Sequence, residues 1–445
     1  MGVMSAFNER MRSLSNFLHS DELKESGRSK STDFTRKSPL NFVNLMLILL
    51  NKQGLTNTME LMEFFEKIGE NEVTKEALSQ ARMKITAWAF KKIKLHHLKM
   101  FYEGDKAKRF KNYLLFACDG SKVELPHHKL LIRVFGGIKN KFKEITSCRA
   151  NSSIVYDVLN KFIIDFEIDT YKTSEIVLAY LNLANLFKES FLTNMKKVFI
   201  FDRSYRSLEL FHYLIKNEEK FIFRLRTKDY KKERLKIRNN DQSIDIFITK
   251  TRTNHIKDKK LKNELLELGK LNLRIIQVKL VTGEIEYLIT NLNKKEFKYE
   301  DIVEIYRLRW EIEGSFKVLK SLLKIENISG YSKLAVHQDF SSQIVIYNFM
   351  NDMRRTSQII KDKNNQDSPF KKKKEGKINT NIAIGIFKSK MVNIFLEDDE
   401  IKQIELLNQI TLKITRYYTN PSTKNYERPI NTPPRKNPTN CRRSF

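Results

Sequence analysis

One predicted helix of this chain presents a carboxylate among cations, a combination that suits phosphate chemistry. At about 100° per residue, one arc of roughly 80° holds Tyr306, Arg309, Glu313, Lys317 and Lys320. In one interpretation, Glu313 forms helical ion pairs with Arg309 and Lys317, each contributing about 0.3–0.5 kcal/mol. In the other, the arc binds a phosphodiester, because cations crowded beside one anion repel one another unless a further anion joins them.

The adjoining arc of the same segment is apolar and predicts how the helix packs. It spans roughly 80° and consists of Ile305, Leu308, Ile312, Phe316, Leu319 and Leu323. We therefore expect a single long helix from near residue 301 through residue 323, with its apolar stripe in the core.

Two further carboxylates follow short apolar runs. YLLFAC precedes Asp119 and KVFIF precedes Asp202, and neither run alternates, as expected for strands covered on both faces of a sheet. Each acid would then lie at a strand end. Local alternatives stay open, since Asp119 also suits a turn with Gly120, and Asp202 also suits the cap of a helix over residues 204–214.

The elements around these acids predict an α/β fold. From about residue 108 the order is strand, strand, strand, helix, strand, carried by YLLFAC, KLLIRVFGG, EITSCRA, SEIVLAYLNLANLFKES and KVFIF. After residue 220, the strand candidates SIDIFITK, LNLRIIQVKL and IEYLITNL predict a β-rich insertion. Before residue 105, apolar residues recur at three- and four-residue spacing, which predicts helices.

Residues 306–320, YRLRWEIEGSFKVLK, have the spacing Tyr, two residues, Arg, three residues, Glu, six residues, Lys. This string resembles the Y-R-E-K signature of the DDE transposases of bacterial insertion sequences, in their group four branch. CDGSKVELP resembles the first acidic motif of that family and FDRSYRS the second, with Ser204 where many relatives have Gly. NISGYSKLAVHQDF and SSQIVIYNFM resemble the segment after the glutamate, so the resemblance covers roughly residues 38–355.

The resemblance implies an RNase H-like catalytic core, a mixed sheet flanked by helices, in which Asp119, Asp202 and Glu313 converge. These acids would be the catalytic residues and the ligands of two Mg²⁺ ions, with Mn²⁺ as a substitute. Such hard cations prefer carboxylate oxygens, and a pair of them can activate a nucleophile and stabilise a leaving oxygen.

Contacts with DNA are also implied by the resemblance. Tyr306, Arg309 and Lys320 would hold the backbone of the transposon end, with Arg203 and Tyr205 close to the same strand. The helical wheel adds Lys317 and Trp310. The ring of Trp310 either stacks on an unpaired base or packs beneath the insertion.

The activity implied is that of a transposase, which cleaves DNA at insertion-sequence ends and transfers the strands into target DNA. Its partners would be double-stranded terminal inverted repeats and target DNA, bound by a homodimer. Two alternatives remain: a catalytically inactive, transposase-derived DNA-binding protein, and an RNase H-like nuclease that cuts without joining.

Composition agrees with a polyanionic partner. Lys and Arg number 82 against 53 Asp and Glu, a formal charge of +29, which favours nucleic acid but equally an anionic membrane surface or ribosomal RNA. The three cysteines form neither a disulfide framework nor a zinc motif. The apolar run at residues 42–50 is far shorter than a membrane span of about 20 residues, so we expect a cytoplasmic protein without a membrane partner.

These observations predict four units in the chain. Residues 1–105 would form a helical N-terminal domain that binds DNA, and residues 106–220 plus 297–355 the RNase H-like core. Residues 221–296 would form the β-rich insertion, and residues 356–445 a basic C-terminal region with a mobile tail.

Overall fold

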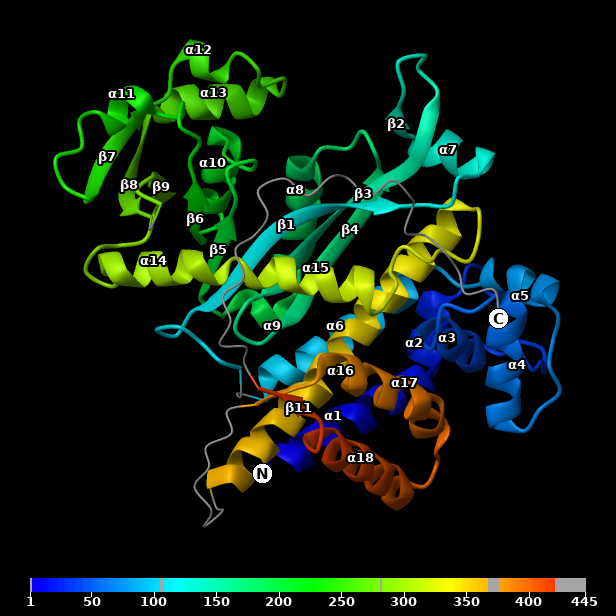
Figure 1. Ribbon diagram of the computed structural model, residues 1–445. Coiled ribbons are helices and arrows are strands. Elements are labelled where there is room, and N and C mark those ends of the chain that lie inside the picture. The colour runs from blue at the N-terminus through cyan, green and yellow to red at the C-terminus, as the bar shows by residue number, and fades with distance from the viewer. Residues whose placement is uncertain (1, 105–106, 281, 367–375, 421–445) are drawn as a thin grey trace.

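The computed structural model describes residues 2–104, 107–280, 282–366 and 376–420. Most of the tail that was predicted to be mobile lies outside these residues. Figure 1 shows a twisted sheet with helices on both faces and a helical body beside it, so the chain is a mixed α/β protein. No helix of the described residues is long and apolar enough to cross a membrane.

The first hundred residues are helical. They form α1 (Val3–Leu18), α2 (Asp21–Gly27), α3 (Phe42–Leu50), α4 (Asn57–Ile68), α5 (Lys75–Arg82) and α6 (Trp88–Glu103). The side chains of Ser20, Asn41, Thr56 and Thr74 accept a backbone N–H at the start of α2 to α5. Such N-caps satisfy an otherwise unpaired donor, which explains where these short helices begin.

Nine strands form one mixed sheet. They are β1 (Leu114–Glu124), β2 (Gly137–Lys139), β3 (Ile145–Asp157), β4 (Phe162–Thr170), β5 (Lys197–Phe201), β6 (Lys220–Arg224), β7 (Asp241–Phe247), β8 (Lys270–Lys279) and β9 (Ile285–Thr290). The order is β2-β3-β1-β5-β6-β9-β8-β7, and β4 pairs with β3. The pairs β1–β5 and β5–β6 are parallel and the others are antiparallel.

Helices cover both faces of the sheet (Figure 1). One face packs against α8 (Glu175–Leu186), the short α9 (Ser190–Thr193) and α10 (Leu208–Lys216), and Phe116 and Cys118 belong to that core. The other face packs against α14 (Tyr299–Leu308), α15 (Glu311–Ser321) and α16 (Lys333–Gln366), and Leu115 and Ala117 lie in that core. Alternation along β1 therefore places successive side chains in two different cores.

The remaining elements surround this sheet. They are α7 (Lys129–Phe135), α11 (Lys231–Arg234), α12 (Lys250–Thr253), α13 (Lys259–Leu268), β10 (Lys377–Ile378), α17 (Thr380–Leu396), α18 (Glu400–Thr415) and β11 (Tyr418–Thr419). The predicted insertion holds α11 to α13 and β7 to β9. Its strands continue the core sheet through β6 and β9, so the insertion is an extension of that sheet.

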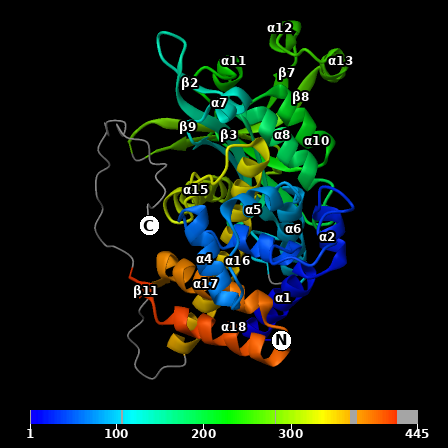
Figure 2. The same cartoon turned by 90° about the vertical axis from the view of Figure 1, so that its right-hand side faces the viewer.

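The N-terminal and C-terminal helices share one core. In Figures 1 and 2 α1, α17 and α18 lie together beside α16, and α1 contacts both α16 and α18. Arg10 of α1 donates two hydrogen bonds of 2.8 and 2.6 Å to buried Asp352 of α16, and His97 Nε2 of α6 lies 3.0 Å from the same carboxylate. The periodicity of either terminal segment gives no sign of this pairing.

One strand prediction was wrong, and one strand was not predicted. KLLIRVFGG forms helix α7 followed by the short β2, because the His128 side chain accepts the Leu130 N–H and the apolar residues Leu131 and Phe135 bury one helical face. A segment of only seven residues is too short to distinguish the period of a helix from that of a strand. The third antiparallel strand of the core is instead β4, for which no strand was predicted.

His337 of α16 should make the stability of the fold depend on pH. Its Nε2 is buried without a hydrogen-bond partner among the described residues, and burial, aided by Lys333 and Lys91, lowers its pKa to about 4. Between pH 6.5 and 4 the imidazole is protonated in the unfolded chain but not in the folded chain. The free energy of unfolding should therefore decrease as the pH is lowered through that window. Urea midpoints at pH 7 and pH 5 should differ less for His337→Phe than for the wild type.

The matched control for this prediction is His255→Gln, since His255 is largely exposed. An equal change in midpoint between pH 7 and pH 5 for wild type and His337→Phe would contradict the prediction.

Candidate active site

Asp119 and Asp202 lie at the same level of two neighbouring parallel strands. Cys118 pairs with Phe201 in the β1–β5 register, and the two aspartates are the next residues along. Strand alternation directs both side chains to the face of Ala117 and α15. The expectation that Asp202 follows its strand is confirmed, since β5 ends at Phe201. Asp119, however, lies in the middle of β1, because pairing with β3 extends the strand to Glu124.

The helix predicted over residues 301–323 is broken at Arg309 and Trp310. The N–H groups of Arg309 and Trp310 bond three residues back, to Tyr306 and Arg307, at 3.0 and 3.3 Å. The N–H groups of Ile312 and Glu313 follow the same pattern at 3.1 and 3.2 Å. These tight turns separate α14 from α15. A single helical wheel therefore does not describe the whole segment.

Arg309 connects two of the acids. Its Nη1 lies 3.7 Å from Asp119 Oδ2 and its Nη2 donates to Glu313 Oε1 at 3.2 Å. Burial opposes the charge of this guanidinium, but Tyr306 and the carboxylates of Asp202, Asp119 and Glu313 raise its pKa. The site is thus organised around one buried cation, with the Arg309 side chain 5% exposed and the Glu313 side chain 43% exposed.

The carboxyl group of Asp119 lacks full charge compensation. Burial raises its pKa to about 6, and the charges of Glu175 and Asp202 act in the same direction. The Gly120 N–H, which donates to Asp119 Oδ1 at 2.9 Å, and Arg309 only partly oppose this. A cation bound beside Asp119 and Asp202 would supply the missing charge, so the donor chemistry fits a hard divalent ion. Among the described residues, no group of three His, Cys, Asp or Glu side chains is already arranged to hold a metal ion.

Comparison with known proteins identifies the family of this arrangement. Residues 111–349, more than half of the 445-residue chain, match the family described as the transposase DDE domain. The chain belongs to this family.

One relative and one solved structure are also similar to this DDE-domain chain. A transposase for insertion sequence element IS1151 from Clostridium perfringens is 35% identical over 83 residues, which is 19% of this chain and 17% of that protein. The match therefore spans about a sixth of that relative's length. The cryo-EM structure of the piggyBac transposase synaptic complex with hairpin DNA aligns with a TM-score of 0.42 at 10% identity, covering 96% of this chain and 87% of that one.

The other predicted site residues of this DDE-domain chain differ in exposure. Arg203, Lys317 and Trp310 are exposed, and the Arg309 guanidinium lies 4.9 Å from the Trp310 ring. Tyr205 is fully buried in the core beneath α8 and α10, so its side chain does not reach the surface. The hydroxyls of Tyr205 and Tyr306 are buried without a hydrogen-bond partner among the described residues.

Lys320 is held on the β1 side of α15. Its ammonium donates to the Lys122 carbonyl at 2.6 Å and lies 3.3 Å from Glu326 Oε1. Glu326 in turn accepts the Glu124 N–H of β1 at 3.0 Å. These contacts fix the end of α15 against the strand that contains Asp119.

Sequence reasoning missed three charged residues that border the acids. Glu175 begins α8 and lies so close to Gly120 that a Cβ there would be 2.8 Å from Glu175 Cγ. Arg224 of β6 and Glu286 of β9 form an ion pair of 2.7 Å whose charges act on Tyr306. Glu175 resembles an ordinary first-turn acid, and the Arg224–Glu286 pair depends on strand pairing, so neither had a local signal.

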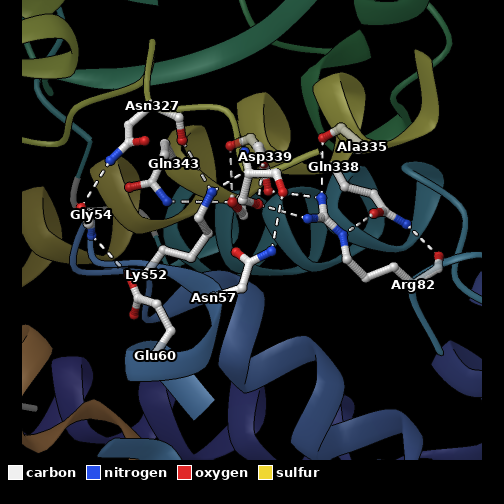
Figure 3. Close-up of polar contacts among 12 residues, drawn as sticks. Lys52, Gly54, Asn57, Glu60, Arg82, Asn327, Ala335, Gln338, Asp339 and Gln343 are labelled. Carbon is white, nitrogen blue, oxygen red and sulfur yellow. Dashed lines mark hydrogen bonds and ion pairs between the residues drawn. The ribbon is translucent and has the colours of Figure 1, made fainter. Parts of the chain in front are cut away.

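A buried polar network holds the segment between α15 and α16 against the N-terminal helices (Figure 3). Asp339 of α16 accepts a hydrogen bond from Arg82 at 2.9 Å and lies 3.1 Å from Lys52 Nζ. The same carboxylate accepts the N–H and hydroxyl of Ser329 at 2.6 and 2.7 Å. Asn327 donates to the Gly54 carbonyl at 3.1 Å. The helices before residue 105 therefore fix the chain that leaves the Glu313 helix.

Proposed function

We propose that this chain is a metal-dependent transposase that cleaves DNA at the ends of an insertion sequence and joins the ends to target DNA. The observation that carries the proposal is the contact of Arg309 with Asp119 and Glu313, together with the charge of Asp202 acting on the same guanidinium, in a chain of the DDE family. An RNase H-like core is supported by the order of antiparallel β1, β3 and β4, helix α8 and parallel β5 and β6.

Asp119, Asp202 and Glu313 would hold Mg²⁺ or Mn²⁺, in the proposal two ions. Bound metal would neutralise charge on the scissile phosphate and activate the attacking oxygen. The chain itself contributes Asp119 of β1, Asp202 directly after β5, and the more exposed Glu313, whose carboxylate is hydrogen-bonded to Arg309.

Arg309 would donate to a phosphate oxygen beside the acids, because a guanidinium forms strong, directional hydrogen bonds with phosphate. Arg203 and Lys317 would contact the DNA backbone from the surface. Tyr306 and Tyr205 are buried and would act as positioning residues, Tyr306 for Arg309 and Tyr205 for the turn after Asp202. Lys320 would keep α15 in place against β1.

The DNA partner would be the terminal inverted repeats of the element, followed by target DNA, bound by a homodimer in the cytoplasm. The similarity to the IS1151 insertion-sequence transposase supports this substrate class. The formal charge of +29 supports binding to a polyanion.

Purified chain, Mg²⁺ or Mn²⁺ and a duplex with the inverted repeats that flank its gene would test the proposal. We expect a nick at the repeat end and, with plasmid target present, joined products. Cleavage without joined products would favour a nuclease that cuts only. Binding to the repeat without metal-dependent cleavage would favour an inactive DNA-binding descendant.

Trp310 allows a separate prediction about an unpaired base. Its ring is 48% exposed, so Trp310→Ala should cost little folding stability. If the ring stacks on a base at the cleaved end, the variant should lose about 1–3 kcal/mol of affinity for a DNA end with unpaired bases and little for a fully paired end. Fluorescence anisotropy with the two DNAs measures the difference, and Trp88→Ala, with 48% exposure on α6, is the matched control.

A further inference from the structure

A projection leaves the sheet between β1 and β3 and is not explained by the acid site. Figure 1 shows α7 and the β2–β3 hairpin extending beyond the other strands. β2 pairs only with the start of β3, from Gly137 with Cys148 to Lys139 with Ile145. We define the arm as residues 137–147.

The tip of the arm combines an exposed aromatic ring with lysines. Phe142 is 72% exposed, and Lys141 Nζ lies 5.0 Å from the centre of its ring. Lys139 and Lys143 are exposed beside it. Residues 137–147 contain three lysines against one acid, Glu144. A solvated phenylalanine at this position contributes almost nothing to the fold, so its presence suggests a binding partner.

The turn that presents Phe142 is held by its own hydrogen bonds. Asn140 Oδ1 accepts the N–H groups of Phe142 and Glu144 at 2.9 and 3.0 Å. The Asn140 N–H donates to the Glu144 carbonyl at 2.9 Å and its side-chain amide donates to the Glu144 carboxylate at 3.0 Å. Lys143 adopts φ 66°, which closes the turn. The conformation of the arm is therefore set before a partner binds. Binding then costs little conformational entropy.

The chemistry of the tip fits duplex DNA. Lysines are depleted in protein–protein interfaces but bind phosphates, and apolar side chains flanked by cations can enter a DNA groove. α7, which packs on β3, adds the exposed cations Lys129 and Arg133. The lysines around Phe142 and the cations of α7 favour DNA over a second copy of this chain.

The register of the sheet sets the reach of the arm. Asp119 pairs with Ile154, which lies twelve residues after Phe142. At about 3.3 Å per residue the tip lies up to roughly 40 Å from the acids. At about 3.4 Å per base pair this distance equals about twelve base pairs, close to one turn of B-DNA.

We propose that the arm, residues 137–147, binds duplex DNA about one helical turn from the scissile phosphate, with its lysines on phosphates and Phe142 in a groove. This inference rests on the proposed function for the position of the scissile phosphate. The basic, aromatic tip could bind DNA even if the acids did not cleave it, so the two claims separate experimentally.

The test compares short and long duplexes with the full chain. The short duplex ends about 6 base pairs beyond the scissile position on each side, which excludes the predicted contact. The long duplex ends about 20 base pairs beyond it, which includes that contact. The arm variant is Lys139→Ala, Lys141→Ala and Lys143→Ala together. The control variant removes the same charge from exposed lysines of α17 and α18, with Lys390→Ala, Lys402→Ala and Lys413→Ala.

On the long duplex, the arm variant should bind at least about tenfold more weakly than the control variant. The slope of log Kd against log salt should fall by about 2.7, at 0.9 for each lost phosphate contact. On the short duplex the two variants should bind alike. Phe142→Ala should weaken binding to the long duplex without changing the salt slope, because no charge is lost.

Equal affinity and salt slope for the arm and control variants on the long duplex would overturn the proposal. So would a change in the oligomeric state of the DNA-free chain on removal of Phe142, since that outcome identifies the arm as a protein interface. Failure of the wild type to cleave any repeat would contradict the proposed function and leave these binding results interpretable.

Discussion

Glu313→Gln is expected to lose metal-dependent cleavage by roughly 10²–10³-fold or more, the loss found when one electrostatic stabiliser of a transition state is removed. Glutamine keeps the size of the side chain and an oxygen that can accept the Arg309 hydrogen bond, now 3.2 Å long. It removes the negative charge that a hard cation needs. DNA affinity should be nearly unchanged, because the surface cations remain. Cleavage of a labelled repeat in Mg²⁺ and in Mn²⁺ measures the loss.

The control for this prediction is Glu304→Gln, an exposed glutamate of the neighbouring helix α14. It makes the same chemical change without touching Arg309 and should cleave at the wild-type rate. A Glu313→Gln variant that cleaves as fast as the wild type would remove Glu313 from the proposed acid triad.

The apolar half of the helical wheel predicted burial correctly for four of its six residues, while Leu308 and Phe316 are only partly buried. Ile305, Ile312 and Leu319 are fully buried, and Leu323 is nearly so. The stripe survives the break at Arg309 and Trp310, since apolar residues on both sides of it belong to the same core. The polar half was less accurate, since Tyr306 and Arg309 are 4% exposed.

The break itself had no signal in the sequence. Neither Gly nor Pro occurs at residues 309–310, and the turn accompanies a contact between Arg309 and Asp119, which lies 190 residues earlier. One interpretation of the local pattern was an ion pair between Arg309 and Glu313, and that ion pair is present at 3.2 Å. They could not indicate that the same guanidinium also faces β1, because that contact depends on the packing of α15 on the sheet.

The two aspartates show the same limit. A buried apolar run predicted the strand before each acid, and the strands are neighbours in the sheet. The central position of Asp119 within β1 arises from its antiparallel partner β3, whose residues Arg149 to Ile154 pair with Glu124 to Asp119. Polar residues after Asp119 hid this extension, since pairing between strands needs backbone groups and not apolar side chains.

Asp339→Ala is expected to destabilise the fold by about 3–5 kcal/mol, the cost of leaving a buried charge without its partner. The variant would leave Arg82 and Lys52 buried without this carboxylate, and their side chains are 7% and 9% exposed. Asp339→Asn, which keeps the shape and loses the charge, should show most of the same loss. Urea unfolding followed by circular dichroism measures both, with Asp362→Ala on the exposed part of α16 as the control.

The pH dependence of this contribution follows from the same charges. Although burial opposes ionisation, Arg82 and Lys52 lower the pKa of Asp339 to about 2, against 3.8 for an ordinary aspartate. Its stabilisation should be complete above pH 3.8 and be lost as the pH falls towards 2. The difference between wild type and Asp339→Asn should therefore shrink in acid. A difference that stays constant between pH 5 and pH 2.5 would show that shape, and not charge, holds α16 and the end of the Glu313 helix to the N-terminal helices.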